Sequence, residues 1–206
     1  NCDWWFTNEA ILLDTAGRYT TETDDHDEWM AFLEQLLKFR AAKPLNGVIV
    51  AVSVSELLDA TDDQIQSTAS KVRARIDEMQ DTLKEILPVY VMFTKIDLVA
   101  GFAEFFGDMK KSERSQPWGS TLRLDADKSQ PGKVFDDEFD VLVEKLHTRG
   151  LKRMALERNR DLKEKVYQFP LEFAAIKRSL SDFLQAAFTV QGKGLQPILR
   201  GFYFTS

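Results

Sequence analysis

The sequence contains a single cysteine, Cys2, among its 206 residues, so no disulfide can form within the chain. Such sparse use of cysteine fits a reducing compartment. No apolar run approaches the roughly 20 residues that a membrane-spanning helix needs, and no signal peptide opens the chain. The net charge of -6 gives no support for nucleic-acid binding. The first residue is Asn, and we expect the chain to be part of a longer protein.

Several signatures of chemistry are also absent. No Gly-x-x-x-x-Gly-Lys-Ser/Thr phosphate loop occurs anywhere in the sequence. His26 and His147 lie far apart and lack the spacing of metal ligands. The apolar content of 44% and charged content of 29% are ordinary for a globular protein. The length allows one large domain, or one domain with a subdomain.

One apolar run ends in a motif that can serve a nucleotide site. The four apolar residues 10–13 predict a strand buried on both faces. Asp14 follows at the carboxyl end of this strand, where a carboxylate can hold magnesium through a water. Gly17 comes three residues later, and its backbone amide can approach a terminal phosphate closely. The next residue is Arg18, where Ras-like enzymes have a glutamine that orients the attacking water. Arg18 is either a phosphate contact or a surface arginine.

A second motif, Thr94-Lys-Ile-Asp97, follows the apolar run 89–93. Lys95 can lie along a purine face, and Asp97 can accept two hydrogen bonds from guanine. Adenine has an acceptor at the matching ring nitrogen, so a carboxylate there favours guanine. The two motifs stand in the order that a GTPase has them. The alternative is that Asp14 and Asp97 only cap turns after strands.

The sequence predicts an α/β fold: a P-loop GTPase-like sheet that lacks its first strand and phosphate loop, with a mostly helical subdomain. Residues 1–132 and 195–206 form the partial core in this prediction, and residues 133–194 the helical insertion. Helical periodicity predicts five helices: one from Glu28, one that starts with a capping box of Thr61 and Gln64, one near 101–107, one near 134–146 and one after Pro170. Proline suits the first turn of a helix. Gly150 is expected to break or kink a helix. Strands are expected near residues 3–7, 10–14, 48–53, 89–94 and 198–204.

The missing strand would lie between the strands 10–14 and 48–53 in a GTPase. We therefore expect a gap at that place, or direct pairing of those two strands, because unpaired buried backbone is costly.

Four stretches resemble the IcmF/TssM family of large inner-membrane proteins of type VI secretion systems. They are Asn1–Phe6, the run from Ala10 to Tyr19, Thr94–Asp97 and the closing Leu199–Ser206. The resemblance implies a GTPase-like domain on the cytoplasmic side of the bacterial inner membrane, with its phosphate loop upstream of this chain. It implies that Asp14 and Gly17 match the magnesium and γ-phosphate motif, and that Thr94, Lys95 and Asp97 match the guanine motif. Thr205 and Ser206 fall where a third base-side loop would lie.

The resemblance further implies GTP or GDP with magnesium as cofactors of the full-length protein, and none for this chain alone. Other secretion-system components are the implied partners. Two alternatives stay open: a truncated active GTPase of another lineage, and an interaction module that has lost nucleotide chemistry. Whether the full protein hydrolyses nucleotide is also left open.

The run from Arg149 to Lys165 holds seven bases against three acids. We expect the helical segment around it to pack its apolar faces on itself and to present these bases to a partner component or to anionic lipid. A solvated helix face is the alternative. Arg153, Arg158 and Arg160 are the bases whose reversal would then weaken docking while leaving the fold intact.

Overall fold

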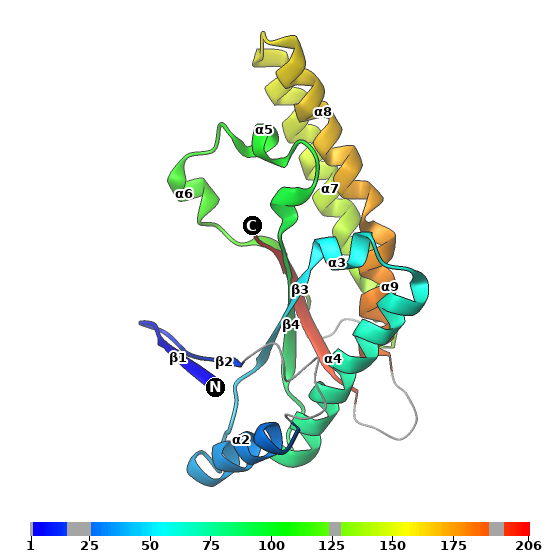
Figure 1. Ribbon diagram of the computed structural model, residues 1–206. Coiled ribbons are helices and arrows are strands. Elements are labelled where there is room, and N and C mark those ends of the chain that lie inside the picture. The colour runs from blue at the N-terminus through cyan, green and yellow to red at the C-terminus, as the bar shows by residue number, and fades with distance from the viewer. Residues whose placement is uncertain (1, 16–25, 124–128, 190–195) are drawn as a thin grey trace.

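The computed structural model describes residues 2–15, 26–123, 129–189 and 196–206. The protein is a mixed α/β fold with a four-stranded sheet in the order β3-β4-β6-β5 and a separate hairpin of β1 and β2 (Figure 1). Strands β3, β4 and β6 are parallel, and β5 pairs antiparallel with β6. The strands are β1 Cys2–Phe6, β2 Ile11–Thr15, β3 Val48–Ser53, β4 Pro88–Thr94, β5 Trp118–Thr121 and β6 Ile198–Phe204. The five expected strands are confirmed, and β5 is additional.

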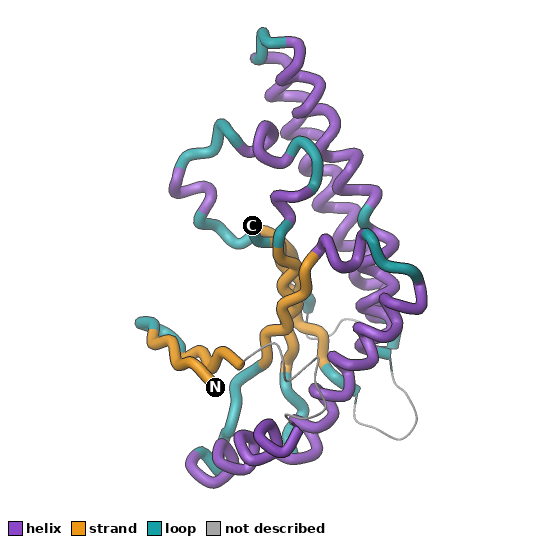
Figure 2. Tube along the Cα trace, viewed as in Figure 1, coloured by secondary structure: helices purple, strands orange, loops and turns teal. Residues whose placement is uncertain are grey.

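The helices lie mainly along one side of the four-stranded sheet (Figure 2). None in the described ranges is long and apolar enough to cross a membrane. Their bounds are α2 His26–Phe39, α3 Val54–Leu58, α4 Asp62–Leu83, η1 Ile96–Leu98, α5 Phe102–Phe106, α6 Lys111–Arg114, α7 Pro131–Leu156, α8 Arg160–Ala175 and α9 Lys177–Phe188.

Helix α4 begins with the expected capping box. The Gln64 amide donates to Thr61 Oγ1 at 3.4 Å, and the Thr61 amide donates to Gln64 Oε1 at 2.8 Å. Each bond satisfies a backbone donor that the first helical turn leaves free. The helix ends at Leu83, where Lys84 takes the left-handed conformation with φ of 58°.

Two expectations about helix ends are wrong. Helix α7 continues through Gly150, and Pro170 lies inside α8 rather than in a first turn. Asn159 supplies the actual start of α8, because its side chain accepts from the amides of residues 161 and 162. A Cβ at Gly150 would stand 3.3 Å from Phe105 and 3.8 Å from the Pro170 ring. The glycine therefore serves close approach of α7 to α5 and α8 and does not interrupt the helix.

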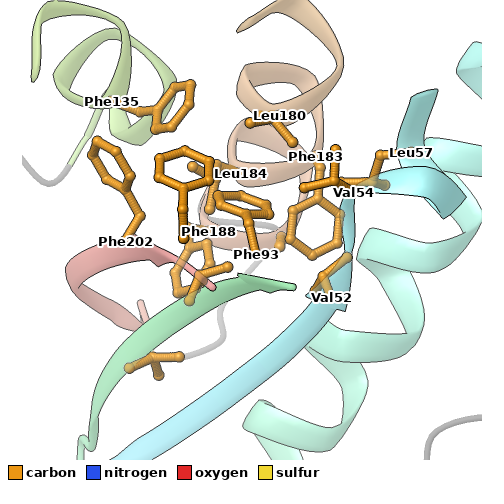
Figure 3. Packing of buried hydrophobic residues seen from close by; sticks show 14 of the residues in the cluster. Val52, Val54, Leu57, Phe93, Phe135, Leu180, Phe183, Leu184, Phe188 and Phe202 are labelled. Atoms are coloured by element: carbon orange, nitrogen blue, oxygen red, sulfur yellow. The ribbon is translucent and has the colours of Figure 1, made fainter. Parts of the chain in front are cut away.

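The core is centred on Phe93 of β4, which is fully buried (Figure 3). Its ring lies edge-on to Phe135 of α7 and Phe183 of α9, with centroid distances of 6.4 Å to each. It also stacks on Phe204 of β6 at 5.5 Å. The helices of the expected insertion do pack on one another, and α7 and α9 also share one core with the sheet. The division at residues 133–194 stays a prediction.

The face of the sheet opposite these helices is only partly covered. Along β4, Val89 and Val91 are fully buried, whereas Tyr90 and Met92 between them are half-buried. Ile49 on the neighbouring strand β3 is 54% exposed. Strand β3 stands at the sheet edge, so within the described residues one row of its backbone groups faces no strand.

The β1–β2 hairpin stands apart from this edge (Figure 2). The expected burial of residues 10–13 on both faces is wrong, since Ile11 is 50% and Leu12 44% exposed. No strand in the described residues flanks the hairpin to cover them. In the described residues β2 does not pair with β3, so the expected direct pairing of these two strands is ruled out. The other expected outcome, a gap left by a missing strand between them, stays a prediction.

Strand β5 was not predicted because its sequence, Trp-Gly-Ser-Thr, is short and polar. Its pairing partner decides its structure: a Cβ at Gly119 would collide with the carbonyl oxygen of Phe202 on β6. The ring of Trp118 packs against Phe173 at 5.0 Å and closes that end of the core.

Replacing Phe93 with alanine should destabilise the fold by about 3–5 kcal/mol, because a cavity would open among the rings that surround it. Urea unfolding followed by circular dichroism measures this change. The control is Phe39→Ala, whose side chain is 77% exposed at the end of α2. That control should lose less than about 1 kcal/mol. Equal losses in the two variants would contradict the central place of Phe93.

Candidate functional site

The Thr94–Asp97 segment turns sharply at the carboxyl end of β4. Lys95 adopts the left-handed conformation with φ of 60°, which reverses the chain into η1. Thr94 Oγ1 donates to the Val52 carbonyl at 3.4 Å and ties the ends of β4 and β3 together. Ile96 is fully buried, whereas Lys95 and Asp97 on either side are exposed. The buried isoleucine thus anchors a loop that presents one base and one carboxylate to solvent.

The carboxyl end of β6 lies directly beside this loop. The Ile96 amide donates to the Thr205 carbonyl at 3.2 Å, and the Thr205 amide donates to the Phe93 carbonyl at 3.0 Å. Thr205 is therefore held by two backbone hydrogen bonds, one to Ile96 of the 94–97 loop and one to Phe93 of β4. In parallel α/β sheets, ligands bind at this carboxyl edge.

Two further hydroxyl groups lie at the same edge of the sheet, and they were not predicted from the sequence as part of a site. Ser53 Oγ and Ser55 Oγ lie 2.8 Å apart where β3 ends and α3 begins. Ser53 is 7% exposed. The available signal was the pair of serines directly after the apolar run 48–52, at the end of a predicted parallel strand.

Asp14 lies on the hairpin, away from the sheet that carries Asp97. It is exposed and opposite Asp3 in the β1–β2 register. Directly opposed residues share a face of an antiparallel pair, so the two carboxylates lie on one side. The structure brings Thr94, Lys95 and Asp97 together and leaves Asp14 in the other sheet. Gly17 and Arg18 lie outside the described residues.

The thiol of Cys2 lies close enough to Asp3 and Asp14 for their charges to affect its pKa. Burial raises the pKa of Cys2, and the negative charges of Asp3 and Asp14 raise this pKa further. Nearby carboxylates oppose formation of the thiolate, so Cys2 is a poor nucleophile at neutral pH. Among the described residues, no group of three or more His, Cys, Asp or Glu side chains is arranged to hold a metal ion.

Comparison with known proteins assigns the family. The family described as the IcmF-related N-terminal domain matches residues 22–206. The type VI secretion system component TssM1 of Pseudomonas aeruginosa (strain PAO1) is 45% identical over 213 residues. The chain belongs to the IcmF/TssM family. The match covers 100% of this chain and 19% of TssM1, so the chain spans about a fifth of that relative. No solved structure matches the IcmF/TssM chain significantly.

Removing the charge of Asp14 should accelerate alkylation of Cys2. Asp14→Asn deletes one of the two charges that raise the pKa of the thiol, so more thiolate is present at a given pH. The rate of iodoacetamide labelling between pH 7 and pH 9, followed by mass spectrometry, measures the effect.

The labelling rate of the wild type should rise at a higher pH than that of a free cysteine. The pH profile of the Asp14→Asn labelling rate should shift to lower pH. Asp27→Asn, on helix α2, is the matched control and should leave the profile unchanged. Identical profiles for wild type and Asp14→Asn would show that the carboxylate does not lie beside the thiol.

Proposed function

We propose that this IcmF/TssM chain is the base-binding part of a GTPase-like domain in a type VI secretion component. One observation carries the proposal: the 94–97 loop and Thr205 are joined by a backbone hydrogen bond at the carboxyl edge of a parallel sheet. A base-binding site in a GTPase-like sheet needs two such loops side by side. The family relationship to TssM1 supports the secretion role.

In this proposal Asp97 selects the base. Its exposed carboxylate accepts hydrogen bonds from the ring N–H and the exocyclic amine of guanine. The aliphatic stem of Lys95 covers one face of the purine, as long basic side chains do over flat apolar surface. Thr94 holds the end of the loop to β3 through its bond to Val52.

In this proposal the phosphate half of the site is shared between this chain and a preceding part of the full-length protein. Asp14 provides a magnesium carboxylate and Gly17 an amide for the terminal phosphate, while the phosphate loop and its strand belong to a preceding part of the full-length protein. The free edge of β3 and the exposed Ile49 leave room for that strand.

The remaining alternative is an interaction module that kept the strands and lost nucleotide chemistry. It differs from the proposal in one respect, the absence of a phosphate loop from the longer protein. The alternative of a GTPase of another lineage is disfavoured by the family match. We place the full-length protein at the bacterial inner membrane, with this domain on the cytoplasmic side and other secretion components as its partners.

The 206-residue chain alone should show no saturable binding of guanine nucleotide at micromolar protein concentration. The amide cradle and lysine of a phosphate loop supply most of the grip on the phosphates, and this sequence holds no replacement. Titration of a fluorescent GTP analogue with magnesium, read by anisotropy, measures the affinity. Micromolar binding by this chain would show that the site does not depend on a missing part.

In a longer form of the protein that includes the preceding segment, Asp97→Asn should weaken GTP binding about tenfold or more. The substitution removes charge-assisted hydrogen bonds of ~1.5–3 kcal/mol each. Binding of xanthosine triphosphate should improve, because an amide can donate to the oxygen that replaces the amine of guanine. Competition titrations measure both affinities, with Asp62→Asn as the control. If GTP binds the Asp97 variant as tightly as wild type, this loop does not read the base. If the longer form binds no nucleotide, the interaction module is favoured.

A further inference from the structure

A groove of about 650 Å³ runs along helix α7 and is closed on one side by Asp108, which follows α5. Its lining includes Val141, Lys145, Lys152 and Leu156. These positions are separated by four, seven and four residues, so they form one stripe of the helix. The stripe is distinct from the buried one, on which Phe135, Phe139 and Leu142 face the core.

The groove carries an excess of positive charge. Arg149 and Arg153 both bind the same oxygen of Asp108, at 2.7 and 2.9 Å. One carboxylate thus serves two guanidinium groups. Lys145 and Lys152 are exposed, and neither forms an ion pair within the described parts of the chain. Four bases therefore line the groove against two acids, although the chain as a whole has a net charge of -6.

Apolar side chains mark the two ends of the stripe. Val141 is 43% exposed and Leu156 is 86% exposed. They stand fifteen residues apart on one helix, a separation of roughly 22 Å at 1.5 Å per residue. A helix of about 15 residues that lies along α7 would reach both.

We propose that this groove binds an acidic amphipathic helix of a protein partner. Acidic side chains of the occupant face Lys145 and Lys152, and apolar side chains near its two ends cover Val141 and Leu156. Recognition of this kind, a helix in a groove, is common among protein modules. The recessed shape favours a helix over a bilayer, because a flat membrane surface cannot follow the floor of a groove.

The assignment narrows the docking surface expected from the basic run 149–165. Arg153 is structural: it is 13% exposed, donates to the Phe105 carbonyl, and binds Asp108. Its reversal would break contacts that hold α5 to α7, so we now expect the Arg153 reversal, unlike those of Arg158 and Arg160, to lower the stability of the fold. Arg158 lies between α7 and α8, and Arg160 is the first residue of α8; both are exposed and outside the groove lining. They supply a control with the same change in charge.

The test uses the 206-residue chain and a fluorescein-labelled acidic peptide of about 18 residues, with leucines fifteen positions apart and glutamates on the same helical face. Anisotropy at low salt should show saturable binding that weakens as salt is added. Lys145→Glu combined with Lys152→Glu should weaken binding about tenfold or more, since like charges would then oppose each other. Leu156→Ser should weaken it without changing thermal stability.

Two controls make the test specific. Arg158→Glu combined with Arg160→Glu should change peptide affinity by no more than about twofold, because these side chains lie off the groove. A peptide of identical composition with adjacent leucines should bind more weakly. The proposal is overturned if the Arg158/Arg160 double variant loses binding while the Lys145/Lys152 double variant keeps it. It is equally overturned if the two peptides bind with the same affinity. It is also overturned if the chain binds neither peptide but sediments with vesicles rich in phosphatidylglycerol, which would favour a membrane contact.

Discussion

The packing of Phe93 is the interaction on which the rest of the structure depends. This ring sits on the middle of three parallel strands and contacts α7, α9 and β6 at once. The next residues along the chain are Thr94 and Lys95, so the candidate base loop begins at the most firmly packed point of the sheet. The Phe93 carbonyl also accepts the Thr205 amide. The same residue therefore fixes both loops of the candidate site, one through packing and one through a backbone bond.

Strand edges elsewhere in the molecule lack a pairing partner within the described residues. Strand β3 has a free edge within the described residues, and the β1–β2 hairpin forms a sheet of its own with exposed Trp4, Trp5 and Phe6. An isolated two-stranded hairpin is only marginally stable in water. In the proposed function, both features mark the place of the phosphate-loop strand. The 94–97 loop and Thr205 lie together at the ends of β4 and β6, whereas Asp14 lies on the separate hairpin.

The α7–α8 pair is held by contacts that leave one face of α7 uncovered. Gly150 lets Phe105 and Pro170 approach the helix, and Asp108 clamps Arg149 and Arg153 beside them. Of these residues, Phe105 and Asp108 follow Asp97 by eight and eleven positions, through η1 and α5. The Asp108 contacts form one wall of the proposed groove. Lys145 and Lys152 of the groove lining remain exposed to solvent, so the groove is also positively charged.

The sequence alone determined the local elements: apolar runs gave five strands, the Thr61 capping box marked α4, and polar residues after strands located the 94–97 loop. These depend on neighbours along the chain, so a linear pattern contains them. Tertiary structure decided what depends on distant partners. Pairing with β6 made Trp118–Thr121 a strand, packing on Phe105 kept Gly150 helical, and Asp108 turned Arg153 from a surface base into a structural one. The hairpin side chains are exposed because β1 and β2 form a separate sheet with no further strand beside them in the described residues, which no local pattern specifies.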